Sequence, residues 1–204
     1  MKKVLLFFCL VATIVLLPLS AEMKVLAFAG STRIDSYNKK LVNEAVEIAQ
    51  QMGAVVTVID LKDYPMPFYD ADLEAEQGMP KNAKRLRELM ISHDAIIIAS
   101  PEYNRSISGV LKNALDWASR GEDGSSSKEA FKGKKFAIMS ASPGKNGGSR
   151  GLIHLSCVIE DVGGTVIAKQ VTIPRAHHYF SEKQRPKNPL LKEEIQLLLQ
   201  SNSL

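Results

Sequence analysis

The chain has 204 residues, 45% of them hydrophobic and 24% charged, which is enough for one globular domain of ordinary size. Its formal net charge is +4, but lysines and arginines are interspersed with acidic residues and form no long basic run. We therefore expect a solvated surface of mixed charge and no nucleic-acid partner. Two cysteines, Cys9 and Cys157, provide no disulfide framework and no zinc site, and we expect Cys157 to be a small core residue.

Residues 1–22 form a hydrophobic N-terminal extension laid out like a secretory signal. Two lysines precede a nearly continuous apolar run, which ends in a proline and small residues at Ala21. The run is short for a membrane span, which needs about 20 residues, and we expect no span in the domain that follows. Met23 stands directly before the first expected strand, so a misassigned start is an equal alternative. A start at Met23, or an uncleaved extension, predicts a cytoplasmic domain over residues 23–204, whereas a true signal predicts export.

From Met23 onward, short apolar runs alternate with amphipathic segments, a pattern typical of a parallel sheet with crossover helices. The β-branched content of the runs predicts strands that are buried on both faces. We expect strands at Lys24–Ala29, Val55–Asp60, Ala95–Ser100, Lys135–Ser140 and Thr165–Thr172. We expect helices at about 38–52, from Pro80 onward, at about 109–117 and 151–162, and in PLLKEEIQLLLQ near the C-terminus. The pattern predicts an α/β fold, a flavodoxin-like doubly wound five-stranded parallel sheet with helices on both faces, rather than the larger Rossmann sheet.

The stretch AGSTRIDSYN, residues 29–38, connects the first strand to the first helix. It contains a glycine that allows a tight turn, several short polar residues and one planar cation: Gly30, Ser31, Thr32, Arg33, Ser36 and Asn38. The positive end of the helix dipole points into the same loop. The loop therefore favours a phosphate, although it lacks the glycine patterns of dinucleotide and nucleoside-triphosphate sites. An ordinary connection with Ser36 as the helix N-cap is an equal alternative.

Two further loops follow the third and fourth strands. SPEYNRSISG, residues 100–109, combines an aromatic face with polar groups, ahead of a helix that Ser108 can cap. SASPGKNGGSRG, residues 140–151, has glycines that let the backbone approach a ligand closely. Each loop alone also fits an ordinary structural role. A doubly wound sheet brings all three loops to one edge, so together they predict one site for a phosphate and a flat ring.

GSTRIDSYNKKL, residues 30–41, and PEYNRSISGVLKNALDWASR, residues 101–120, resemble the two signatures of the NADPH-dependent FMN reductase family. SPGKNGGSR resembles its third loop, and the likeness extends over most of residues 23–172. It implies an enzyme that passes hydride from NADPH or NADH through bound FMN to a small-molecule acceptor: a quinone, a flavin, an azo compound or a metal oxyanion. Ser108 stands where many members have proline.

The same resemblance implies the residues of the cofactor site. They are Ser31, Arg33, Ser36, Tyr37 and Asn38 at the FMN phosphate, Pro101, Glu102, Tyr103 and Asn104 along the ring, and Ser142 with Gly144 on its pyrimidine side. It implies no catalytic side chain and no metal ligand, because the flavin carries the chemistry. It also implies a homodimer or homotetramer, for which Trp117 and YPMPFYD, residues 64–70, are candidate contact surfaces.

Three other interpretations of the sequence have less support. A non-enzymatic FMN electron carrier of flavodoxin type is the main alternative, but such carriers are usually acidic and this chain has a net charge of +4. A hydrolase with Ser31 or Ser106 as nucleophile would need a G-x-S-x-G elbow, which neither serine has. His177 and His178 have no acidic or cysteine partner at metal-binding spacing and fit a structural pair or a rim of the site better.

Overall fold

The computed structural model describes residues 22–167, 170–181 and 188–200. Apart from Glu22, the signal-like N-terminal extension lies outside these residues. Within the described ranges, no helix is both long enough and apolar enough to cross a membrane.

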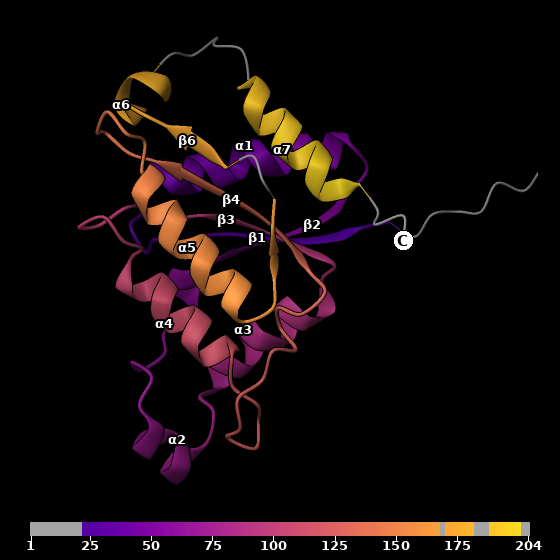
Figure 1. Ribbon diagram of the computed structural model, residues 1–204, viewed down its shortest axis with the longest axis vertical. Helices are drawn as coiled ribbons and strands as arrows, with labels where there is room; N and C mark the ends of the chain where they lie inside the picture. The colour runs from indigo at the N-terminus through magenta and orange to yellow at the C-terminus, as the bar shows by residue number, and fades with distance from the viewer. Residues whose placement is uncertain (1–21, 168–169, 182–187, 201–204) are drawn as a thin grey trace, which may run out of the picture.

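A parallel sheet forms the centre of the molecule (Figure 1). Its strand order is β2-β1-β3-β4-β5, the flavodoxin-like order that the sequence predicts. The strands are β1 (Lys24–Ala29), β2 (Val55–Asp60), β3 (Ala95–Ala99), β4 (Lys135–Ala141), β5 (Thr165–Val166) and β6 (Val171–Ile173). The strand expected over Thr165–Thr172 is thus two short strands, of which β5 pairs with the beginning of β4 and β6 with its end. The strand order reverses next to β1, so the carboxyl ends of β1 and β3 form the place where such sheets bind ligands.

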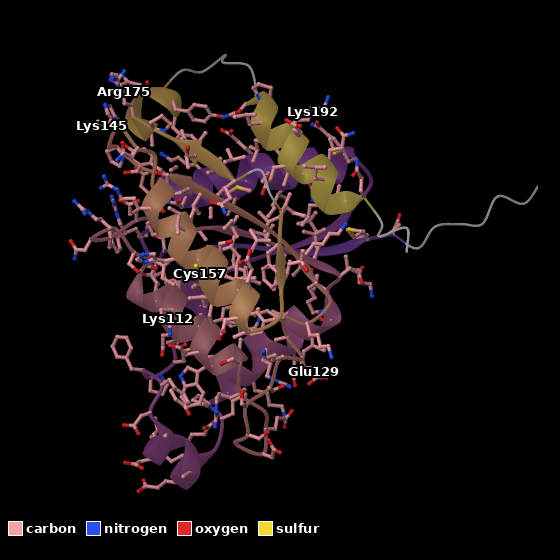
Figure 2. The ribbon with its side chains drawn as sticks, in the orientation of Figure 1. Lys112, Glu129, Lys145, Cys157, Arg175 and Lys192 are labelled. Carbon is pink, nitrogen blue, oxygen red and sulfur yellow. The ribbon has the colours of Figure 1, made fainter. Side chains whose placement is uncertain are left out.

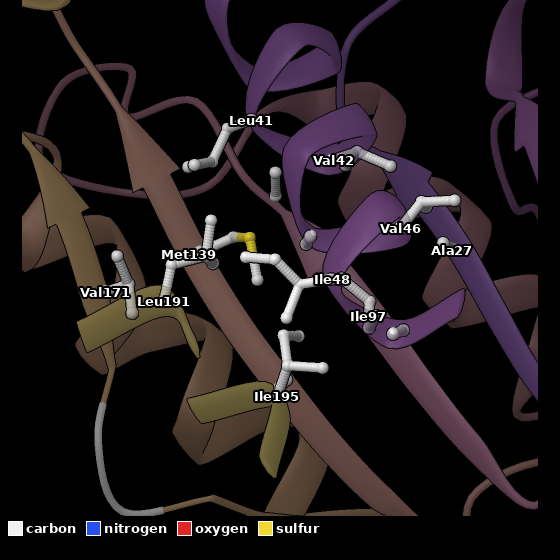
Figure 3. Close-up of a cluster of buried hydrophobic side chains, with 14 of the residues drawn as sticks. Ala27, Leu41, Val42, Val46, Ile48, Ile97, Met139, Val171, Leu191 and Ile195 are labelled. Carbon is white, nitrogen blue, oxygen red and sulfur yellow. The ribbon is translucent and has the colours of Figure 1, made fainter. Parts of the chain in front are cut away.

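Helices cover both faces of the sheet (Figure 1). The helices α1 (Tyr37–Gln51) and α7 (Pro189–Leu199) lie on one face, and α3 (Lys81–Ser92), α4 (Gly109–Ala118) and α5 (Ser149–Asp161) lie on the other. Figure 3 shows the first of the two cores, where Leu41 and Ile48 of α1 and Ile195 of α7 pack on Ile97 and Met139 of the sheet. Burial of each such side chain contributes about 1.5–3 kcal/mol, so the sheet is held rigidly from both sides.

The helix ends follow signals in the sequence. Ser108 caps α4, because its hydroxyl accepts a hydrogen bond from the N–H of Leu111 at 3.2 Å. Asn188 caps α7 in the same way, 2.9 Å from the N–H of Leu190. Gly53, with φ +90°, follows the end of α1 as expected.

Three parts of the fold differ from the sequence-based expectation. The strand β2 is an edge strand, and Val55 and Val58 are 46% and 49% exposed, so burial on both faces is wrong for this strand. The connection after β2 contains the 3-10 turn Leu61–Asp63 and the short helix α2 (Ala71–Gln77), which has no apolar face to reveal it. A further short helix, α6 (Ala176–Tyr179), follows β6.

Two side chains lie in environments opposite to those expected. Trp117 is fully buried and donates a hydrogen bond from its indole nitrogen to the carbonyl of Pro67 at 2.9 Å, so it is not a subunit contact. Cys157 lies on α5 and is exposed, so its assignment to the core is wrong (Figure 2). Cys157 lies on the side of α5 that faces away from the sheet, whereas Trp117 is covered by the loop that contains Pro67 and Tyr69.

Candidate functional site

The three loops that the sequence singled out meet at the carboxyl edge of the sheet, around a hollow of about 80 Å³. We call this hollow the cradle. Its lining residues are Ser31, Arg33, Ser36, Tyr37, Asn38, Pro101, Glu102, Tyr103, Ala141, Ser142 and Pro143. Nine of the eleven expected site residues are among them. The other two, Asn104 and Gly144, lie on the same loops outside the lining, and Ala141 and Pro143 had not been expected.

The loop after β1 presents polar groups that suit an anion. Ser31 and Ser36 are only 4% and 5% exposed. Ser36 stands at the N-cap position of α1, but its side chain makes no capping hydrogen bond. The alternative role of Ser36, as an N-cap through its hydroxyl, is therefore not what this structure contains, and the hydroxyl remains available to a ligand.

The one acidic residue of this loop is neutralised by its neighbour. The carboxylate of Asp35 lies 2.6 Å from the ammonium of Lys40 on the first turn of α1. The hydrogen bond from Lys40 lowers the pKa of Asp35, which favours the ionised carboxylate. Arg33 forms no ion pair with any described residue, although its charge also helps to lower the pKa of Asp35, so its guanidinium can bind an anion.

Asn38 joins the first and third loops. Its side-chain amide donates to the carbonyl of Ala141 at 3.0 Å and accepts from the N–H of Ala141 at 2.9 Å. The side chain is buried, so this pair is protected from water. The amide thus fixes the start of α1 to the end of β4, a role that the sequence pattern could not distinguish from direct phosphate binding.

Glu102 joins the second and third loops. Its carboxylate accepts hydrogen bonds from the main-chain N–H groups of Arg150 and Gly151, both at 3.0 Å, at the beginning of α5. A negative charge is favourable there because the N-terminus of a helix carries partial positive charge. Glu102 therefore has a positioning role through its side chain, in addition to lining the cradle.

Ser108 joins the first and second loops. Besides capping α4, its hydroxyl donates to the carbonyl of Gly30 at 2.6 Å. A Cβ atom on Gly30 would lie 2.8 Å from the side chain of Leu111, so only glycine allows the two loops to approach this closely. Ser108 thus starts the helix and adds a bond between two loops.

The third loop is held from its far side by the turn between β6 and α6. The N–H of Ala176 donates to the carbonyl of Ser142 at 3.0 Å, and the N–H of Arg175 donates to the carbonyl of Gly144 at 3.1 Å. The hydroxyl of Ser142 accepts from the N–H of Gly144 at 3.2 Å, which closes a tight turn. All three loops are therefore fixed by hydrogen bonds before any ligand arrives.

The residues of the cradle fit the phosphate end of FMN. Two buried hydroxyls, an unpaired arginine and the N-terminus of a 15-residue helix are the donor set that a phosphate needs. At about 80 Å³ the hollow is well below the roughly 300 Å³ of a site that encloses a whole organic ligand. It can thus enclose the phosphate only, and a flat ring would lie on the rim formed by Tyr103, which is 51% exposed, and Pro143.

A larger hollow lies elsewhere, next to the edge strand. Its volume is about 330 Å³, and it is lined in part by Val58 and by the ion pair of Lys39 with Asp60, whose oxygen and nitrogen are 2.5 Å apart. Burial opposes ionisation of Asp60, but the hydrogen bond from Lys39 prevails and lowers its pKa. The charges of this pair neutralise each other, so Lys39 is less suited than Arg33 to bind a phosphate, and size alone does not identify the site.

Known proteins resemble this chain in sequence and in structure. Residues 23–178 match the family described as NADPH-dependent FMN reductase. An NAD(P)H-dependent FMN reductase of Pseudomonas aeruginosa is 35% identical over 187 residues, which cover 91% of this chain and 96% of the relative. A quinone reductase of Escherichia coli K12 is 33% identical over 151 residues, 74% of this chain and 77% of the relative.

Solved structures agree with this assignment. The flavoenzyme NAD(P)H:(acceptor) oxidoreductase of Paracoccus denitrificans has a TM-score of 0.61 and 32% identity, over 72% of this chain and 75% of that chain. A flavodoxin of Bacillus cereus has a TM-score of 0.50 and 14% identity, over 86% and 94%, and supports the fold alone. The chain therefore belongs to the NADPH-dependent FMN reductase family and is an oxidoreductase that uses FMN and a reduced nicotinamide nucleotide.

Proposed function

We propose that this protein passes electrons from NADPH or NADH, through FMN held at the cradle, to small acceptors such as quinones, flavins, azo compounds or metal oxyanions. The observation that carries the proposal is the cradle itself, in which buried Ser31 and Ser36 and unpaired Arg33 meet the N-terminus of α1. The quinone reductases among the relatives support quinones as one class of acceptor.

In this proposal the protein binds and orients FMN, and FMN carries out the electron transfer. Ser31, Arg33 and Ser36 bind the phosphate, while Pro101, Tyr103 and Ser142 border the ring. FMN, when bound, supplies the two-electron redox chemistry. The bonds made by Asn38, Glu102 and Ser108 keep the three loops at fixed separations, so the ring is presented without rearrangement of the loops.

The first experiment is the visible absorption spectrum of the purified full-length protein, followed by anaerobic addition of NADPH and NADH separately. A yellow protein that bleaches with a nucleotide and recovers its colour when a quinone is added supports the proposal and identifies the donor. A yellow protein that neither nucleotide bleaches supports the flavodoxin-type carrier instead. A colourless protein that cannot be loaded with FMN contradicts both.

The phosphate site has its own test. Arg33→Ala combined with Ser36→Ala removes a cation and a hydroxyl without breaking a hydrogen bond that holds the loops together, unlike a change at Asn38. We expect FMN affinity to fall by at least 100-fold, since each charged hydrogen bond contributes about 1.5–3 kcal/mol. Lys81→Ala, which removes an exposed charge from α3, is the matched control. Full FMN affinity in the double variant would contradict the assignment.

We further propose that the protein is a homodimer or homotetramer and that Phe68 is part of the contact. Phe68 is 78% exposed, yet its loop is rigid, since the Pro67 carbonyl accepts from Asn113 at 2.9 Å and the N–H of Tyr69 donates to Asn113 at 2.8 Å. An exposed aromatic side chain on a loop held by hydrogen bonds is a common anchor of interfaces. Light scattering should report more than one copy of the chain, and fewer copies for Phe68→Ala; a monomeric wild type would contradict the proposal.

A further inference from the structure

Strained backbone is concentrated at the rim of the cradle. Among the described residues, the only non-glycine residues with positive φ are Asn104, Arg105 and Arg175, at +50°, +67° and +48°. Asn104 and Arg105 follow Tyr103, which lines the cradle, and the N–H of Arg175 is bonded to Gly144 of the third loop. Residues other than glycine, asparagine and aspartate rarely adopt this backbone conformation, because it brings the Cβ atom close to the following carbonyl oxygen. Two of the three residues are arginines.

Arg105 occupies a turn position that favours glycine. Tyr103 and Ser106 exchange two main-chain hydrogen bonds of 2.9 Å, so Asn104 and Arg105 are the central residues of a two-residue hairpin turn. Both have positive φ, which defines a type I′ turn, where Asn-Gly is the preferred pair. Arg105 is exposed, and within the described part of the chain its guanidinium has no hydrogen bond, ion pair or ring contact. No contact of this arginine side chain with the described residues therefore stabilises the fold.

Arg175, in the turn between β6 and α6, is in the same situation. It stands at the N-cap of α6 with φ +48° and ψ +45°, and its main chain is bonded to Gly144 and His178. Its side chain is exposed and, again considering only the described residues, has no partner. Figure 2 shows Arg175 and Lys145 at the same corner of the molecule, so the corner is positively charged.

Residues with a strained backbone conformation cost stability and are concentrated at functional sites. An arginine offers a planar, permanently charged fork that matches the oxygens of a phosphate. Glycine would suit either backbone position better, and a phosphate bound by the guanidinium would compensate for the cost of an arginine there. The positions lie beside the rim where the flavin ring is expected, which is where a nicotinamide must approach.

We propose that Arg105 and Arg175 bind phosphate groups of the nicotinamide nucleotide that reduces the flavin. This inference rests on the proposed function. The phosphate bound is either the 2′-phosphate, which only NADPH has, or the pyrophosphate, which both nucleotides share. The neighbouring cradle binds the FMN phosphate through separate residues, Ser31, Arg33 and Ser36.

The test uses Arg105→Gly and Arg175→Gly in the full-length, FMN-loaded protein. Glycine removes the cation and also relieves the backbone, so each variant should have a higher Tm than the wild type. The probes are the unreactive tetrahydro forms of NADPH and NADH, titrated by calorimetry. We expect about 10-fold weaker binding for each variant and about 100-fold for the double variant, with an unchanged flavin spectrum.

Lys192→Ala, which removes an exposed lysine from α7, is the charge-matched control and should leave both affinities unchanged (Figure 2). A loss confined to the NADPH analogue supports binding of the 2′-phosphate, and an equal loss for both analogues supports the pyrophosphate. Unchanged affinities in the double variant overturn the inference. A wild-type protein that binds no FMN, or that neither nucleotide reduces, instead overturns the proposed function.

Discussion

Glu102 and Gly151 meet across two different loops: the carboxylate of Glu102 accepts the N–H of Gly151 at 3.0 Å. A Cβ atom on Gly151 would lie 3.2 Å from the carbonyl of Ser106 and 3.3 Å from the Cβ of Glu102. The loop after β3 and the first turn of α5 are therefore in direct contact, and the close approach favours glycine at position 151 and an acceptor at position 102. This contact sets the separation of the two loops that border the expected flavin ring.

Glu102→Ala should weaken both the fold and cofactor binding. The variant leaves two main-chain N–H groups of α5 without their acceptor, which costs about 1.5–3 kcal/mol of the free energy of unfolding. Glu102→Gln keeps an acceptor but loses the charge, so we expect an intermediate loss. Urea denaturation and FMN titration measure the two effects. Glu76→Ala, an exposed change on α2, is the control, and an Ala variant as stable as this control would contradict the positioning role.

Ser108→Ala tests the link between the first two loops. The change removes the acceptor for the N–H of Leu111 and the donor to the carbonyl of Gly30. Loss of the cap and of a buried hydrogen bond should lower the free energy of unfolding by about 1–3 kcal/mol. Ser156→Ala removes a hydroxyl from the solvent side of α5 and should cost little. Equal denaturation midpoints for the two variants would refute the expectation.

Gly148→Ala should prevent normal closure of the third loop. Gly148 has φ +92°, and an added Cβ would lie 1.9 Å from the hydroxyl oxygen of Ser140. We expect a loss of several kcal/mol of stability, because both a clash and an unfavourable φ are introduced. Ser140→Gly in the same chain removes the clashing atoms but not the φ penalty, so it should restore part of the loss. Thermal unfolding of the single and double variants measures this, and a double variant no better than the single would exclude the clash as the cause.

Glu194 makes stability depend on pH. It is fully buried in α7, and neither of its carboxylate oxygens has a hydrogen-bond partner of ordinary geometry among the described residues. Burial raises its pKa from 4.5 to about 8. The nearby main chain of Ile138 acts in the opposite direction and lowers the pKa, but by less than burial raises it. Between these two values the folded protein keeps a proton that the unfolded chain releases. Stability therefore falls as pH rises through this range, by up to about 1.4 kcal/mol per pH unit, and then levels off.

Glu194→Gln should remove this dependence, because the amide is neutral at every pH. We expect the variant to be more stable than the wild type at about pH 9 and close to it at about pH 5, where both side chains are uncharged in the fold. Urea denaturation across the range measures the difference. Parallel pH profiles for the two proteins would show that Glu194 is not the group responsible.

The strand positions and the three loops could be predicted because each depends on local sequence. Strands of a parallel sheet appear in the sequence as short apolar runs. The strands β1 and β2 accordingly have the bounds that the sequence predicts. The exposure of Val58 was not predictable, because nothing in an apolar run reveals that its strand is at the edge. The helix α2 was missed because its main anchor is a side-chain ion pair between Glu74 and Arg120, at 2.8 Å, rather than an apolar face.

Most residues that line the cradle could be picked out from the sequence, but the contacts of their side chains could not. Asn38 and Glu102 belong to recognisable motifs, yet their side chains bind main-chain groups 103 and 49 residues away. No local pattern specifies such a partner. Trp117 was predicted to be a subunit contact because it is a large aromatic residue. In the structure it is buried beneath a loop that lies 50 residues earlier in the chain, which no local pattern indicates.

The bond between Asn38 and Ala141 also bears on when the cofactor can be acquired. The two residues are 103 positions apart, and the third loop is in turn held by Ala176. The cradle, which we propose as the FMN site, therefore cannot form until most of the chain has left the ribosome. On this proposal, FMN would bind only after the chain has folded as far as Ala176, and therefore in the compartment where the chain folds.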